Sequence, residues 1–297
     1  MQPTRRSFLL GGRLFGGQWS RFLHRVSRVV QGRLDDLSDG RGTPPVARLT
    51  VRRPEDVQHA RALCTEMGVQ MGLWGTHAVA TGPLLWVDPA GLRAFTLLPS
   101  GAWRADPGVP VAALQTQGLL PDDLAVDGEM AVACWLATLA GAELDRVVCA
   151  PTGLEAAQVL LFDGQSDRLD RFGAGTRREP LGLALRDIVS ELFRYAQRPA
   201  LQPWREHGFW PARYRLDALW QTEPNLAKLL AGSQGTLAWV EALEWSALPA
   251  PWPDGADRAA MPPASNATDR ATAVWLDEQV KLSFDPQSLL AQLPAAA

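Results

Sequence analysis

The sequence predicts an α+β protein, in which helices and strands alternate along a chain of 297 residues. The first observation is a change of hydrophobic period, from strand-like alternation over residues 46–51 to helical spacing over 54–68 and back to a strand-like run over 69–74. The second is a composition of 46% hydrophobic and 21% charged residues, typical of a soluble globular protein. The third is the length, which suffices for one large domain or two small ones.

Composition also excludes several classes of protein. No run of about eighteen uncharged apolar residues occurs, so we expect no transmembrane segment. A net charge of −3 and a pI of about 5.9 argue against nucleic acid as a partner. Three cysteines and four histidines, without a C-x-x-C or H-x-H pair, predict neither a disulfide framework nor a metal site. We expect Cys64, Cys134 and Cys149 to be buried as small apolar residues.

Residues 1–45 form a basic arm in which eight arginines oppose three aspartates, a net charge of +5. Its start, with Arg5 and Arg6 before an apolar stretch, resembles a twin-arginine export signal, although residues 11–13 interrupt that stretch. The alternative is a basic amphipathic helix over 22–34, which would dock on a partner or on the protein's own acidic body. We expect a cytoplasmic protein, with export as the alternative.

Local signals define the elements that follow the arm. A helix is predicted to begin at Pro54, with two acids in its first turn where the helix dipole favours them, and to end at Gly68. The strand over 69–74 leads into a loop at 75–77. Three short strands, a turn and a short helix follow, over residues 84–87, 95–98, 102–105, 106–110 and 111–118.

The second half of the chain has a hairpin, a helix and a segment rich in aromatic residues. Asp163-Gly164 is a strong hairpin-turn signal, and apolar spacing predicts an amphipathic helix over 181–195. The aromatic segment 199–211 is either an exposed interface for a partner or a loop that covers the protein's own core. Two further elements are expected, a strand over 237–243 and a Pro- and Ala-rich linker over 249–270.

Sequence stretches in a fixed order resemble the FAD-binding domain of the vanillyl-alcohol oxidase / p-cresol methylhydroxylase superfamily. The most specific is 225–238 (NLAKLLAGSQGTLA), which is similar to a signature of FAD-linked oxidases that act on 2-hydroxy acids. Residues 280–290 resemble the C-terminal segment of that family. Three stretches resemble the first lobe of the domain: 53–69 (RPEDVQHARALCTEMGV), 84–92 (LLWVDPAGL) and 98–114 (LPSGAWRADPGVPVAAL).

The resemblance implies a two-lobed p-cresol-methylhydroxylase-type FAD-binding fold that lacks the substrate cap domain of the full-length family. It covers about 46–250 and 272–293, and the Pro-rich stretch lies where the cap would be inserted. The expected organisation is a basic arm at 1–45, a first lobe at 46–118, a second lobe at 119–249, a linker at 250–271 in place of the cap, and a C-terminal segment at 272–297 that packs back on the FAD-type domain.

The resemblance also implies FAD as the cofactor, bound without a covalent link, and a set of residues that contact it. A covalent link through His77, in a loop resembling a Gly-Gly-His loop, is the alternative for that residue. The turn from 232 to 236 has a second interpretation, as a helix-to-strand turn retained for folding. No catalytic residue and no metal ligand is assigned. The expected cofactor-binding residues are Gly75, Thr76, His77, Gly128, Gly232, Ser233, Gly235 and Thr236.

The sequence departs from the family pattern where the cofactor would be held. Leu73 and Trp74 occupy places that resemble the first glycines of the phosphate loop, and a large side chain there would keep a backbone from a diphosphate. Asp127 and Glu129 would repel a pyrophosphate unless they turn away from it. The cap, with the histidines and arginine that bind the hydroxy acid in the family, has no counterpart in this chain.

Two functional hypotheses follow. In the first, the protein is an FAD-binding oxidoreductase subunit of a 2-hydroxy-acid dehydrogenase complex of the glycolate or lactate type, inactive alone. A larger flavin and/or iron–sulfur subunit would then supply the substrate site in a hetero-oligomer, and could bring the chain to a membrane surface. In the second, it is a flavin-free pseudoenzyme that acts as a structural or regulatory partner of a full-length FAD-linked oxidase.

Overall fold

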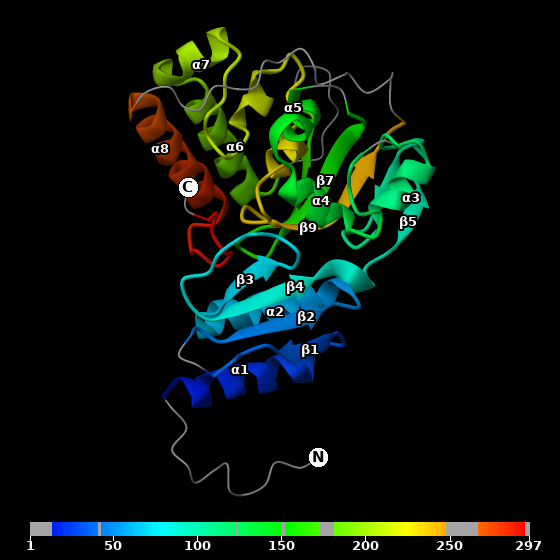
Figure 1. The fold of residues 1–297 in the computed structure, drawn as a ribbon, viewed down its shortest axis with the longest axis vertical. Helices are drawn as coiled ribbons and strands as arrows, with labels where there is room; N and C mark the ends of the chain where they lie inside the picture. Colours follow the sequence, from blue (N-terminus) through cyan, green and yellow to red (C-terminus); the bar gives the residue numbers. More distant parts are fainter. Residues whose placement is uncertain are drawn as a thin grey trace, which may run out of the picture.

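The protein has two lobes, each built on its own β-sheet (Figure 1). A computed structural model describes residues 14–40, 43–122, 124–149, 152–172, 181–247 and 267–294. The first lobe has a four-stranded sheet and the second a five-stranded sheet, with helices packed against both. The α+β, two-lobed architecture expected from the sequence is therefore confirmed.

The first sheet has the order β1 (Arg33–Asp36), β2 (Val46–Thr50), β4 (Leu84–Asp88), β3 (Gln70–Leu73). Both β2 and β3 run parallel to β4, and β1 is antiparallel to β2. Helix α2 (Pro54–Met67) connects β2 to β3 and ends at Gly68, which has a left-handed φ of 65°. This helix has the bounds that its proline, first-turn acids and terminal glycine predicted.

The basic arm is part of the first lobe from Leu14 onward. Helix α1 (Leu14–Val29) buries Phe22 and Val26 completely in the core shared with the first sheet. On its exposed side, Arg25 donates two hydrogen bonds to the Glu66 carboxylate of α2. The helix thus docks on the protein's own body. The twin-arginine motif, within residues 1–13, lies outside the described residues.

The second sheet is antiparallel throughout and has the order β5 (Phe95–Leu97), β6 (Trp103–Ala105), β9 (Trp239–Trp245), β7 (Leu154–Leu160), β8 (Ser166–Asp170). The β7–β8 hairpin turns at Asp163-Gly164, as predicted, with Gly164 at a φ of 85°. Strand β6 pairs with β9 and β5 pairs with β6, so this part of the expected first lobe, 46–118, belongs to the second sheet.

Helices cover the second sheet, and an aromatic cluster lies among them. Trp204 and Trp210 are 2% and 1% exposed and meet edge to face, with ring centroids 5.5 Å apart. The aromatic segment therefore covers the lobe's own core and is not an exposed interface. The helical elements are η2 (Pro89–Gly91), α3 (Val111–Thr116), α4 (Val132–Thr138), α5 (Gly141–Cys149), α6 (Leu183–Ala196), η3 (Pro199–Leu201), α7 (Gln202–Glu206), η4 (Leu216–Trp220), η5 (Leu226–Leu230) and α8 (Ala267–Phe284).

The C-terminal segment ties the two lobes together. Helix α8 packs against α6 of the second lobe, and the chain then returns to β3, where it lies beside the first sheet in Figure 1. There the Met71 N–H donates to the Leu289 carbonyl at 2.7 Å, and the Ala291 N–H donates to the Met71 carbonyl at 2.6 Å. Because α8 begins at Ala267, the last five residues of the expected linker are helical, whereas its part from 250 to 266 lies outside the described residues.

Within the described ranges, no helix is long and apolar enough to cross a membrane.

Candidate cofactor site at the lobe junction

Three segments meet where the lobes join, and they hold seven of the eight expected cofactor-binding residues. They are the loop 74–77 after β3, the helix α4, and the turn 232–236 that precedes β9. The N–H of His77 donates to the side-chain oxygen of Gln234 at 2.9 Å. In the same turn, the N–H of Gln234 donates to the Ala137 carbonyl at 2.8 Å. The convergence brings residues far apart in sequence to one place.

Gly128, the eighth residue, is held by a different helix. Its carbonyl accepts the N–H of Ala112 in α3 at 3.0 Å, and a Cβ on it would meet the Ala112 methyl at 3.2 Å. The neighbouring acids Asp127 and Glu129 are exposed, and the Asp127 carboxylate accepts the N–H of Glu129. These acids belong to a tight turn ahead of α4.

The glycines of the site are required by the protein's own turns. Gly75, Gly232 and Gly235 have φ values of 87°, 70° and 68°, a region that favours glycine. A Cβ on Gly235 would lie 2.7 Å from the Cβ of Leu73, which is closer than side chains approach each other. The space that the missing side chain leaves at Gly235 is therefore filled by Leu73 of the other lobe.

The hydroxyl groups of the turn are bonded inside the protein. Ser233 and Thr236 are 2% and 0% exposed. Ser233 Oγ donates to the Leu230 carbonyl at 2.8 Å, and Thr236 Oγ1 lies 2.6 Å from the Ser233 carbonyl. Tyr214 also shares a hydrogen bond with Thr236 Oγ1 at 2.7 Å, and burial raises the pKa of this tyrosine, so that it stays neutral. This arrangement favours the interpretation of the segment as a turn retained for folding.

The loop after β3 has an exposed tip and a fixed base. Gly75 and His77 are exposed, whereas Thr76 Oγ1 donates to the Leu73 carbonyl at 2.8 Å. Trp74, half-buried, has the Arg48 guanidinium 4.3 Å from its ring centroid. From α4, the Cys134 thiol donates to the Trp74 carbonyl at 2.9 Å, and burial, with the nearby Asp88, raises the pKa of that thiol to about 12.

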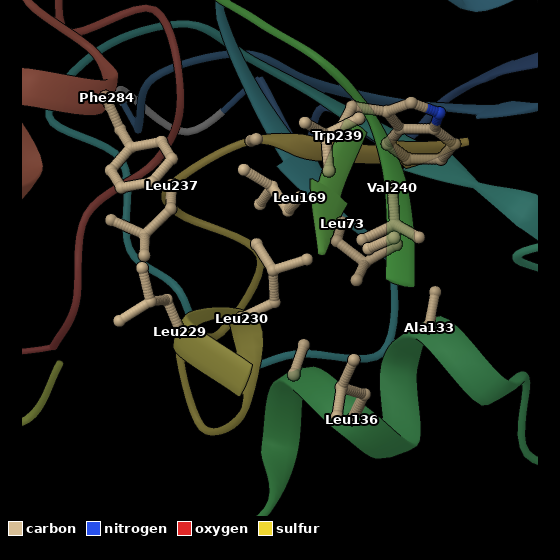
Figure 2. Packing of buried hydrophobic residues seen from close by; sticks show 14 of the residues in the cluster. Leu73, Ala133, Leu136, Leu169, Leu229, Leu230, Leu237, Trp239, Val240 and Phe284 are labelled. Carbon is tan, nitrogen blue, oxygen red and sulfur yellow. The ribbon is translucent and has the colours of Figure 1, made fainter. Parts of the chain in front are cut away.

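The interior of the junction is filled with apolar side chains from both lobes. Figure 2 shows Leu73 of the first lobe among Leu136, Leu230 and Val240 of the second. The cavity that they enclose is about 10 Å³, which is at the lower limit for a single water molecule. Its lining is Leu73, Ala133, Leu136, Ala137, Leu230, Ser233, Gly235, Ala238, Trp239 and Val240.

These residues do not fit an FAD molecule between the lobes. The three fused rings of a flavin need a slot that the 10 Å³ cavity does not provide. The segments that would surround a diphosphate are instead bonded to one another, through Gln234 and Cys134. Sequence reasoning missed both residues. The signal for Gln234 was its place between two glycines, in the Gly-Ser-Gln-Gly turn.

No protein-family model and no curated protein matches the sequence. Solved structures of oxidases resemble the chain at low identity. A glucooligosaccharide oxidase from Acremonium strictum with a 6-S-cysteinyl, 8α-N1-histidyl FAD aligns at 15% identity over 76% of this chain and 42% of its own, with a TM-score of 0.42. A carbohydrate oxidase from Microdochium nivale aligns at 14% identity over 77% and 44%, with a TM-score of 0.43.

A third example is the BBE-like 1 protein of Physcomitrella patens, at 12% identity over 75% of this chain and 43% of its own, with a TM-score of 0.44. The chain thus spans less than half the length of each of these proteins. The two-lobed architecture is defined by the chain's own two sheets.

Proposed function

We propose that the protein is a subunit of an FAD-linked oxidoreductase assembly in which a larger partner, with flavin and/or iron–sulfur groups, supplies the substrate site. One observation carries this proposal. Strand β9 ends at Trp245 and α8 begins at Ala267, so only the 21 residues from 246 to 266 separate them. Twenty-one residues cannot build a domain with a core of its own. We therefore assign the binding and orientation of the substrate to a partner.

The chain's own chemistry is consistent with a dependence on a partner. Within the described ranges, no group of three or more His, Cys, Asp or Glu side chains could hold a metal ion. Two of the histidines lie far apart in the fold: His77 in the loop at the lobe junction, and His207 at the end of α7, where its ring contacts the Pro203 carbonyl.

Two versions of this function differ in whether the chain holds FAD. In the first it is the FAD-binding subunit of a 2-hydroxy-acid dehydrogenase of the glycolate or lactate type. The convergence of Gly75, His77 and Gly235 at one place supports that version. In the second it is a flavin-free pseudoenzyme that is a structural or regulatory partner of a full-length FAD-linked oxidase. The filled lobe junction favours the second version.

Purification from the native host tests the proposal. The chain, tagged at its chromosomal locus, is isolated under mild conditions, and the assembly is assayed for flavin released by acid and for dye reduction with glycolate or D-lactate. The matched control is the same chain produced alone. We expect an assembly that contains flavin and reduces dye, and an isolated chain that does neither. An isolated chain that reduces dye by itself, or a native preparation without any flavoprotein, would contradict the proposal.

A further inference from the structure

We infer that the lobe junction is sealed by the protein's own groups in the place of a dinucleotide, so that the two lobes stay joined without FAD and the chain cannot take it up. We call this contact set the seal, and it consists of Leu73, Trp74, Cys134, Gln234 and Gly235. The inference rests on the proposed function only in that it chooses between its two versions. Three separate contacts and the interior of the junction support it.

The first contact brings the side chain of Leu73, in the first lobe, against the main chain of Gly235, in the second. Leu73 ends β3 and is 6% exposed. A Cβ on Gly235 would lie 2.7 Å from the Leu73 Cβ and 3.2 Å from its Cδ2. The α-carbon of the glycine is therefore covered directly by the leucine side chain. No layer of ligand atoms can pass between surfaces in van der Waals contact.

The second contact replaces a phosphate oxygen by an amide oxygen. Backbone N–H groups of a glycine-containing loop are the donors that typically hold an anion. Here the His77 N–H of that loop donates to Gln234 Oε1 at 2.9 Å. Gln234 has a φ of 56°, unusual for a residue with a side chain, and its own N–H donates to the Ala137 carbonyl. Gln234 is held in this conformation with its side-chain oxygen and its backbone N–H both hydrogen-bonded, so we count it as a fixed part of the seal.

The third contact engages the start of α4, which packs beside the loop after β3. The N–H of Val132 donates to the Val109 carbonyl at 2.8 Å, and the N–H of Ala133 donates to the Pro107 carbonyl at 3.1 Å. At the next residue, the Cys134 thiol donates to the Trp74 carbonyl. These donors are bonded to protein carbonyls and are not available to a ligand. Behind them, the apolar interior leaves a cavity of about 10 Å³.

Thermal unfolding of the purified full chain, with and without FAD, tests the inference. A ligand that binds the native state at a hundred times its Kd raises the Tm by several degrees. We expect a Tm that changes by less than about 1 °C at saturating FAD, with no quenching of flavin fluorescence. A rise of several degrees, or stoichiometric quenching, would overturn the inference.

Two variants distinguish a seal from an ordinary surface turn. Gln234→Ala is expected to lower the Tm by about 2 °C, because it removes the hydrogen bond between Gln234 Oε1 and the exposed His77 N–H. The control is Gln197→Ala, at the exposed C-terminus of α6, which should leave the Tm unchanged. Equal effects of the two variants would overturn the role of Gln234.

FAD uptake by the wild-type chain would refute the seal but would leave the proposed assembly standing. A native assembly without flavin would refute the proposed assembly but would leave the seal standing.

Discussion

The ammonium group of Lys281, in the last turn of α8, lies 2.6 Å from the carboxylate of Asp285, the residue that follows the helix, and this ion pair joins the C-terminal segment to the lobe junction. Lys281 also donates to the Thr236 carbonyl at 2.7 Å, in the turn that leads into β9. Asp285 accepts the N–H groups of Leu289 and Leu290, which lie where the chain crosses to β3. One buried ion pair therefore positions both the turn before β9 in the second lobe and the segment at Leu289 and Leu290 that pairs with β3 of the first lobe.

Replacing Lys281 by methionine should destabilise the protein strongly. The side chain of Asp285 is 1% exposed, so the variant leaves a buried carboxylate without its cation. We expect a loss of about 3–5 kcal/mol in the free energy of unfolding. Urea denaturation followed by tryptophan fluorescence measures it. The matched control is Arg194→Met, which removes an exposed ion pair with Glu191 and should change stability by less than about 1 kcal/mol. Equal losses in the two variants would contradict this account of the pair.

Asp277 should make stability depend on pH. Burial raises the pKa of Asp277 from 3.8 to about 6, although its carboxylate accepts the N–H groups of Arg213 and Tyr214. Between these two pH values the native state binds more protons than the unfolded state, so this group's contribution to stability is present below about pH 4 and is lost as pH rises through about 6. The wild type should therefore lose stability relative to Asp277→Asn over this window, measured by urea denaturation at each pH. Parallel pH profiles of the two proteins would contradict the assignment.

The close contact at Gly235 predicts a selective effect of alanine. Gly235→Ala places a methyl group 2.7 Å from Leu73 at a φ of 68°. We expect a loss of about 2–4 kcal/mol, the sum of backbone strain and overpacking. Gly118→Ala is the control, because Gly118 has a φ of 64° and open space where the methyl group would be, so only the strain of about 1 kcal/mol applies. Calorimetric unfolding compares them, and similar losses would show that the lobes do not touch at this point.

Elements with strong local signals could be predicted from the sequence. The helix from Pro54 to Met67 is marked at both ends by residues that act within one turn, and the hairpin at Asp163-Gly164 needs only its own two residues. The pairing of β6 with β9 could not be predicted, because it joins segments more than 130 residues apart and no local pattern records it. The burial of Trp204 could not be predicted either, because a loop rich in aromatic residues has the same sequence pattern whether it faces a partner or the core.

The site was only partly predictable for the same reason. The resemblance indicated that the 75–77 loop and the 232–236 turn belong together, and the structure brings them into contact. The closure of the space between them depends on where the Leu73 side chain points and on the hydrogen bond that Gln234 Oε1 accepts from the His77 N–H. Both are properties of the assembled lobes. Leu73 and Trp74 in place of glycines were the one signal of this closure in the sequence.

The visible absorption spectrum of the purified chain, as isolated and after incubation with FAD and gel filtration, tests the central claim most directly. The sealed junction predicts a colourless protein that releases no flavin on denaturation and remains colourless after added FAD is removed. A yellow protein that releases one FAD per chain, or that retains added FAD in stoichiometric amount through gel filtration, would contradict it.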